Sequence, residues 1–351
     1  MQPQKSINQQ QLPPKPPVLN NEHRHKRGSF LATFFLLLLV AASALVFFYR
    51  QAIIDQITVY RFTPSGSLVK LADTTGLNDL GKFYLYASQA QVSNQAEFNS
   101  ACGSLQNERT VVLGCYAGPD RRIYIYDVPD AALNGVKETT TAHEMLHAAY
   151  DRLSPSDKKH VDDLLVAEES KITDPRILDL IKDYQQSEPN EVVNELHSIF
   201  GTEVRTLSPE LETYYKRYFV DRSEVVAMKE KYEKVFTDLA SKQTSLVAEL
   251  NTLASDVNTR QKEYQISLTA LNADIATFND WAQSGTAKKG EYNARKAVLQ
   301  DRISTLDAER DAINSEIDRY NVKKAELDKL NLQAATLNQS IDSKLLPAPS
   351  L

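Results

Sequence analysis

The sequence contains few cysteines and no motif that recognises nucleic acid. Its 351 residues include only two cysteines, Cys102 and Cys115, whose spacing does not match a cysteine knuckle. The formal net charge is −6, the basic residues are dispersed and no recognition motif appears, so we exclude nucleic acid as a partner. Histidine is also scarce, with six residues, which makes a closely spaced pair of histidines informative.

Proline is missing from residues 221–345, and this stretch is rich in charged and amide side chains. Its apolar residues recur at alternating spacings of three and four, which is a heptad pattern. They include Leu239, Leu246, Leu250, Leu271, Ile313 and Ile341. A glycine-bounded turn, residues 284–290, divides the pattern. We therefore predict a long antiparallel coiled-coil hairpin over 221–345, followed by a short tail, 346–351.

Two details of this stretch bear on its pairing. Arg260, Gln243, Lys324 and Arg310 interrupt the apolar seam, and we expect them either to fix its register or to extend toward solvent. One interrupted helix that dimerises in parallel is the alternative to a hairpin, and the two glycines of the turn argue against it.

The N-terminal region contains one long apolar run. Residues 1–28 are rich in Gln, Pro and Asn and predict a disordered tail. Residues 29–49 are predicted to form a transmembrane helix, because the almost wholly apolar run 30–48, nineteen residues at 1.5 Å each, gives about 28 Å, enough to cross a bilayer. Basic residues lie mainly before this run, which predicts a cytoplasmic N-terminus and an extracytoplasmic remainder.

A cleaved signal peptide is the alternative to a single-pass membrane anchor. Ala42-Ser43-Ala44 resembles a cleavage site, but the apolar run continues to Phe48, which favours the anchor. Disulfides persist outside the cytoplasm, so Cys102 and Cys115 are expected to form one. The alternative is two free buried thiols.

Residues 50–220 are predicted to form one mixed domain. Three β-rich segments, 57–62, 83–86 and 111–113, are expected to be strands, and 94–102 a short helix. Residues 122–128 alternate aliphatic and aromatic side chains and predict a further strand. This strand is either an edge strand that could pair with an extended peptide or a plain core strand.

Three sites downstream place proline in the first turn of a helix: Ser154-Pro155, Asp174-Pro175 and Glu188-Pro189. The apolar residues that follow each site suit amphipathic helices. Gly201 is positioned to end the third helix as a C-cap.

The stretch His143-Glu144-Met145-Leu146-His147 matches the H-E-x-x-H pattern of zinc-dependent hydrolases. On a helix, residues four apart share a face, so both imidazoles can reach one Zn²⁺ ion. Zinc lowers the pKa of a water molecule that it binds, and Glu144 lies close enough to that face to act as general base. A helix that carries two histidines by chance is the alternative.

A catalytic zinc site requires a third protein ligand. Residues 194–203, together with the H-E-x-x-H stretch, resemble the gluzincin-type metallopeptidases, the broad class that includes thermolysin. The resemblance covers residues 122–203. It implies a mostly helical zincin-like domain of the α+β class with a small sheet, and Glu195 as third ligand. It also implies that Asp151 orients one imidazole, although an ion pair of Asp151 with Arg152 or a nearby lysine is equally consistent with the sequence.

His197 is the rival third ligand. In that class an aspartate follows the ligand glutamate by four residues, in the pattern Glu-x-x-x-Asp. Here residue 199 is Ile, so Glu195 does not match the class pattern completely. His197 and Glu195 lie two residues apart and cannot point the same way on one helix. If His197 binds the ion, Glu195 has a supporting or structural role.

We expect a membrane-anchored zinc peptidase that lies outside the cytoplasm and hydrolyses peptide amide bonds. Its architecture is typical of proteins of a bacterial cell envelope. The alternative is a non-catalytic coiled-coil adaptor of the cell envelope with a structural or vestigial metal site. In that case the hairpin docks a protein partner.

Overall fold

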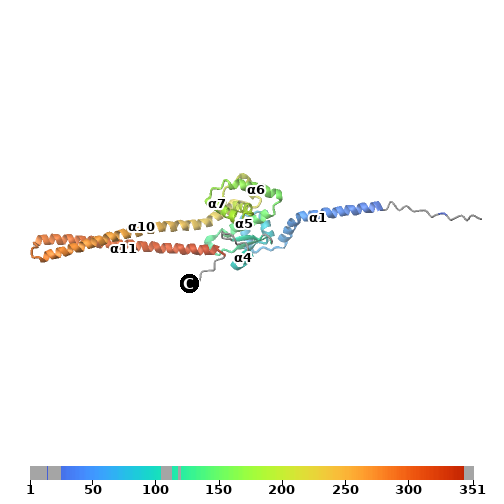
Figure 1. The fold of residues 1–351 in the computed structure, drawn as a ribbon. Helices are drawn as coiled ribbons and strands as arrows, with labels where there is room; N and C mark the ends of the chain where they lie inside the picture. The colour runs from blue at the N-terminus through green and yellow to red at the C-terminus, as the bar shows by residue number, and fades with distance from the viewer. Residues whose placement is uncertain (1–13, 15–24, 104–112, 118–119, 344–351) are drawn as a thin grey trace, which may run out of the picture. The chain divides into compact units, whose positions relative to one another are not determined.

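The computed structural model describes residues 14, 25–103, 113–117 and 120–343. The chain divides into two compact units, residues 1–57 and 58–351. Within the described part, the molecule is mostly helical with one small three-stranded sheet (Figure 1). The predicted segment 111–113 lies mainly outside the described residues, and the two predicted tails lie almost wholly outside them.

The first helix, α1 (His25–Arg61), contains the apolar run. Residues 31–61 are long and apolar enough to cross a membrane, which agrees with the predicted anchor. The strand predicted over 57–62 is wrong, because α1 continues through Arg61. Extending an existing helix adds one hydrogen bond per residue, whereas an isolated strand gains none until it finds a partner.

Two short helices follow, α2 (Gly66–Thr74) and α3 (Asp79–Ala87). Residues 83–86, predicted as a strand, belong to α3. Asn78 caps this helix by accepting hydrogen bonds from the backbone N–H groups of Leu80 and Gly81. The cap and the burial of Leu85 on one helical face outweigh the β-propensity of the aromatic residues.

The sheet contains β1 (Gln91–Ser93), β2 (Gly114–Ala117) and β3 (Arg122–Tyr126) in the order β1-β3-β2. β3 is parallel to β1 and antiparallel to β2, so the strand predicted over 122–128 is the central strand and not an edge strand. The predicted short helix is confirmed as α4 (Gln95–Cys102), and a Cys102–Cys115 disulfide joins it to β2.

The central helix is α5 (Val136–Asp151), which packs against α8 (Val192–Thr202). Gly201 lies inside α8 and not at its cap. A Cβ atom on Gly201 would lie 2.3 Å from Leu146 Cδ1 of α5. Glycine is therefore required here because the two helices approach closely.

Three further helices surround this pair: α6 (Pro155–Glu169), α7 (Pro175–Ser187) and α9 (Pro209–Tyr215). Ser154 and Asp174 cap α6 and α7 with proline in the first turn, as predicted. Pro189 does not begin a helix, since α8 starts at Val192 after a turn. A 3₁₀ turn, η2 (Ala131–Leu133), precedes α5.

Helices α10 (Arg222–Gln283) and α11 (Lys289–Ile341) lie side by side and turn back at 284–288, as expected of a hairpin (Figure 1). Arg260 fixes the register by pairing with Glu309 at 2.7 Å and Glu316 at 2.6 Å, both on the other helix. Gln243 does the same by donating to Asn331 at 2.8 Å. Lys324 and Arg310, the other two interruptions, form ion pairs within α11 itself.

The base of the hairpin is part of the folded domain. Leu239 of α10 and Leu337 of α11 are buried in one cluster with Phe98, Cys102 and Cys115. The first turn of α10 is held by Arg222, which donates to the carbonyl oxygens of Phe200 in α8 and of Val204 and Arg205 just after it. The hairpin is therefore joined to the helix that carries Glu195.

Candidate metal centre

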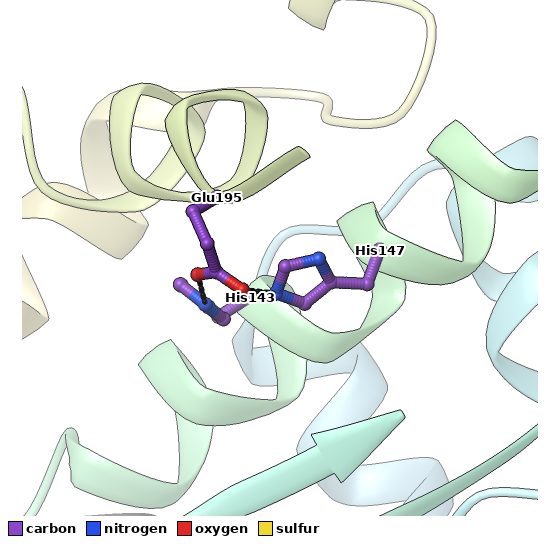
Figure 2. Close-up of side chains that lie close together, drawn as sticks. All are labelled: His143, His147 and Glu195. Atoms are coloured by element: carbon purple, nitrogen blue, oxygen red, sulfur yellow. Dashed lines mark ion pairs between the residues drawn. The ribbon is translucent and has the colours of Figure 1, made fainter. Parts of the chain in front are cut away.

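The two histidines of the H-E-x-x-H stretch lie on one face of α5, with ring centroids 4.8 Å apart. Glu195 of α8 faces them across the helix pair (Figure 2). Its Oε2 lies 3.6 Å from His143 Nε2, and its Oε1 lies 3.5 Å from His147 Nε2. The structure thus brings together two imidazole nitrogens and one carboxylate, with ligand atoms within 4.8 Å of one another.

These separations fit one zinc ion. Ligands about 2.1 Å from a tetrahedral Zn²⁺ lie about 3.4 Å from each other, close to the two nitrogen–oxygen distances, which end on the two different carboxylate oxygens of Glu195. Glu195 Oε2 is buried and has no hydrogen-bond partner in the described part of the chain. A buried carboxylate oxygen without a donor is costly in a folded protein, and a cation bound here would satisfy it.

The electrostatics of Glu195 agree with a ligand role. Burial raises the pKa of its carboxyl group. The neighbouring His147 and His143 side chains and the hydroxyl group of Tyr184 lower the pKa by more than burial raises it, so the net shift is downward. Glu195 is therefore held as a carboxylate, the form that binds a metal ion.

Asn194 orients His147. His147 Nδ1 lies 3.0 Å from Asn194 Oδ1, and an amide oxygen can only accept, so Nδ1 carries the proton. The lone pair is then on Nε2, the nitrogen that faces Glu195. Asn194 is itself held by a hydrogen bond of 3.1 Å from its Nδ2 to Glu191 Oε2.

The resemblance implied that Asp151 orients an imidazole, with an ion pair of Asp151 as the alternative, whereas in the structure the side chain that contacts His147 Nδ1 is Asn194. Asp151 instead accepts a hydrogen bond of 2.7 Å from the Tyr116 hydroxyl group and pairs with Arg121 at 3.0 Å. It lies one turn beyond His147 but is directed toward β2 and the residues that follow it. The only sequence signal for Asn194 was its position beside Glu195.

His197, the rival ligand, is fully buried on another face of α8. Its Nε2 lies 2.8 Å from the Tyr214 hydroxyl group, and its ring contacts those of Tyr150, Tyr215 and Tyr218. Burial, and then the neighbouring His147 and His143 side chains, lower the pKa of His197 to about 3. It is a neutral member of an aromatic cluster and does not belong to the ligand group.

Glu144 is buried between α5 and the edge strand β2. A Cβ atom on Gly114 of β2 would lie 2.7 Å from Glu144 Oε1 and 2.5 Å from Thr140 Cγ2. The strand therefore passes directly over the carboxylate, and only glycine fits at this position. Sequence analysis did not identify Gly114.

A cleft of about 1320 Å³ contains both histidines, Glu144 and Glu195. One side is formed by β2 and another by α7 and the segment between α7 and α8. The base of the hairpin completes the lining with five residues of α10 and two of α11, namely Lys229, Tyr232, Glu233, Phe236, Thr237, Asn338 and Ile341.

The chain was compared with family models, curated proteins and solved structures. No family model, curated protein or solved structure matches it.

Proposed function

We propose that this protein is a membrane-anchored zinc-dependent peptidase that acts outside the cytoplasm. The observation that carries the proposal is the cluster of His143, His147 and Glu195, whose ligand atoms lie within 4.8 Å of one another in a cleft that Glu144 also lines. This donor set, two imidazoles and one carboxylate, is one that catalytic zinc sites use.

Zn²⁺ held by these three side chains would lower the pKa of a water molecule and polarise the substrate carbonyl group. Glu144 removes a proton from this water as its oxygen attacks the carbonyl carbon. The same carboxyl group then passes the proton to the amide nitrogen. The C–N bond breaks, the hydroxyl group stays on the acyl carbon, and the products are a carboxylic acid and an amine.

The edge strand β2 supports a peptide as the substrate. Among the described residues, β3 pairs with one side of β2, and β2 lines the cleft beside Glu144. An extended peptide could add to this edge through backbone hydrogen bonds, which would align its amide bonds with the metal site.

The proposed location rests on two observations. The basic residues of the N-terminal region precede the apolar part of α1, and the Cys102–Cys115 disulfide is typical of an oxidising compartment. We place the N-terminus in the cytoplasm and residues 50–351 outside.

Replacing Glu144 with Gln tests the mechanism in the full chain in detergent micelles. The amide keeps the size of the side chain but cannot accept a proton, so hydrolysis of a denatured protein such as casein should fall by about 10²- to 10⁴-fold. Zinc content, measured by elemental analysis, should stay at one ion per chain. Glu210→Gln, on the exposed side of α9, is the control and should keep full activity. Undiminished turnover by the Glu144→Gln chain would exclude this mechanism.

The hairpin favours a second function, that of a coiled-coil adaptor in the cell envelope. Helices α10 and α11 extend far beyond the last residues that line the cleft. A wild-type chain that binds zinc but hydrolyses no peptide would support the adaptor and contradict the peptidase.

A further inference from the structure

The Cys102–Cys115 disulfide and Glu144 lie on opposite faces of β2. Gly114 and Cys115 are consecutive residues of this strand, and successive side chains of a strand point to opposite faces of the sheet. The face at Gly114 contacts Glu144, because a Cβ atom on Gly114 would lie 2.7 Å from Glu144 Oε1. The Cys115 side chain leaves the other face and is bonded to Cys102 of α4. The strand is therefore held between the disulfide and the proposed general base.

Helix α4, on the far side of the disulfide, is fixed in place. The side-chain amides of Gln95 and Asn99 in α4 both donate to the carbonyl oxygen of Ser343, at 2.7 and 2.6 Å. Phe98 of the same helix is fully buried in the cluster that contains the base of the hairpin. Among the described residues, β2 has a partner strand on one side only. A change of length at the disulfide is therefore expected to move β2 and not α4.

Reduction of the disulfide lengthens this connection. Two thiol sulfur atoms in contact lie about 1.5 Å farther apart than two bonded sulfur atoms. Cys102 is 0% exposed and Cys115 is 6% exposed, so both side chains are enclosed by other atoms. The extra distance moves β2 toward α5, where Gly114 already contacts Glu144. The carboxylate of Glu144 is then displaced.

The two helices that carry the proposed metal ligands are packed in a different part of the domain. Helices α5 and α8 meet in a hydrophobic cluster that contains Leu146 and Phe200 and neither cysteine. The disulfide belongs to a separate cluster, formed mainly by α4, the sheet and the base of the hairpin. A shift of β2 therefore moves the Glu144 side chain without separating α5 from α8.

The disulfide can be reached from the cleft, because Cys115 lines it. One thiolate of a small dithiol attacks Cys115 Sγ, and the Cys102 sulfur leaves as a thiolate. The second thiolate of the dithiol attacks the mixed disulfide and releases the Cys115 sulfur. Each released thiolate takes up the proton that the attacking thiol lost. The disulfide is reduced to two thiols, and the dithiol is oxidised to a cyclic disulfide.

We propose that the Cys102–Cys115 disulfide is a redox switch of the cleft. Reduction by a dithiol displaces β2 and takes Glu144 out of the position that hydrolysis requires, while the metal ligands stay together. This inference rests on the proposed peptidase function and adds a form of regulation to it.

The test compares the full chain, in detergent micelles with one equivalent of Zn²⁺, before and after reduction. Dithiothreitol is the dithiol, it is removed by anaerobic gel filtration, and alkylation followed by mass spectrometry verifies that both thiols are free. Displacement of a catalytic group by about 1 Å can cost about 10²-fold, so hydrolysis of casein should fall by about this factor. Oxidised glutathione should restore it, and the zinc dissociation constant should stay unchanged. Undiminished hydrolysis after complete reduction would overturn the inference.

A chain without cysteines separates a switch from a disulfide that only stabilises the fold. Cys102→Ala with Cys115→Ala removes both sulfur atoms, so β2 has no cause to move toward Glu144. The sequence contains no other cysteine. This variant should hydrolyse casein faster than the reduced wild-type chain and should not respond to dithiothreitol. Activity as low as that of the reduced wild-type chain, or a response to dithiothreitol, would overturn the inference.

Hydrogen–deuterium exchange measured by mass spectrometry tests the displacement without turnover. In the reduced chain, the backbone amides of β2 and of α5 near Glu144 should exchange faster, and those of α8 should exchange at the same rate. This result supports the switch even if the oxidised chain hydrolyses nothing, which would contradict only the peptidase function. Identical exchange of β2 in the oxidised and reduced chains overturns the inference whether or not the protein is a peptidase.

Discussion

Asn194 is the residue whose role is most directly testable apart from Glu144. It fixes the tautomer of His147 through a hydrogen bond of 3.0 Å. Loss of such an orienting partner typically weakens zinc binding by about 10- to 100-fold. We therefore expect Asn194→Ala to raise the zinc dissociation constant by this factor, as measured by competition with a chromophoric chelator. Asn190→Ala, at an exposed position in the preceding turn, should have no effect. Equal affinities in the two variants would contradict the assigned role.

His197 makes stability depend on pH. Its pKa is about 3 in the folded chain and about 6.5 when unfolded, so between these values the unfolded chain binds more protons. The stability associated with neutral His197 is fully present above pH 6.5 and is lost progressively as pH falls toward 3. Between pH 6.5 and pH 5 the loss is about 2 kcal/mol.

The variant His197→Gln keeps a polar group next to Tyr214 but does not titrate in this range. Its free energy of unfolding, measured with urea in metal-free buffer, should therefore fall less between pH 7 and pH 5 than that of the wild-type chain. Parallel pH profiles of the two proteins would show that His197 does not titrate on unfolding.

The spacing of His143, Glu144 and His147 predicted their shared helical face because that face depends only on local geometry. Family resemblance singled out Glu195, and the structure places it at the two imidazoles. Asn194, Gly114 and the direction of Asp151 depend on how α8 and β2 approach α5. Those approaches join residues far apart in sequence, so no local pattern encodes them.

Among the elements, helices with strong local signals were predicted best. Proline after a capping residue located the starts of α6 and α7, and heptad spacing located α10 and α11. The strands predicted over 57–62 and 83–86 were wrong because β-propensity is decided by packing. In the structure residues 57–61 continue α1 and residues 83–86 belong to α3, where Leu85 is buried.

The close approach of α5 and α8 leads to a prediction at Gly201. A methyl group there would lie 2.3 Å from Leu146 Cδ1 and 3.0 Å from Tyr215 Cε1. Overpacking of this kind costs about 1–3 kcal/mol, so Gly201→Ala should lower the free energy of unfolding by that amount. Displacement of α8 should also weaken zinc binding.

Gly290, near the start of α11, provides the matched control. No atom lies within 4 Å of the position that its Cβ would occupy. Gly290→Ala should be neutral or stabilise the helix by up to about 1 kcal/mol. A Gly201→Ala chain as stable as the wild type would mean that α8 can move away from α5 without cost.

At the scale of the whole molecule, the hairpin has two parts with different roles. Its base, up to Thr237 on α10 and from Asn338 on α11, lines the cleft. Removing four heptads from each arm, residues 253–280 and 291–318, takes away the ion pairs of Arg260 but keeps the base, the Gln243–Asn331 hydrogen bond and the turn. We expect this shortened chain to retain its zinc content and its cleavage of short peptides.

A substitution at the base of the hairpin should, in contrast, destabilise the protein. Leu239 is 6% exposed and packs in the cluster that contains the disulfide. Leu239→Asp places a charge there without a partner and should lower the melting temperature, measured by circular dichroism.

A shortened hairpin that folds but loses zinc or peptide cleavage would show that the distant part of the hairpin also supports the site.

Helix α10 extends without interruption for 62 residues, or about 93 Å, from the Arg222 contacts with α8. A tilt of 5° at that end displaces the opposite end by about 8 Å. Conversely, a small sideways force on the distant turn exerts a large torque at the start of α10, close to α8, the helix that carries Glu195. A load applied at the turn would thus act first where Arg222 contacts the end of α8 and the residues after it, close to the helix that carries Glu195.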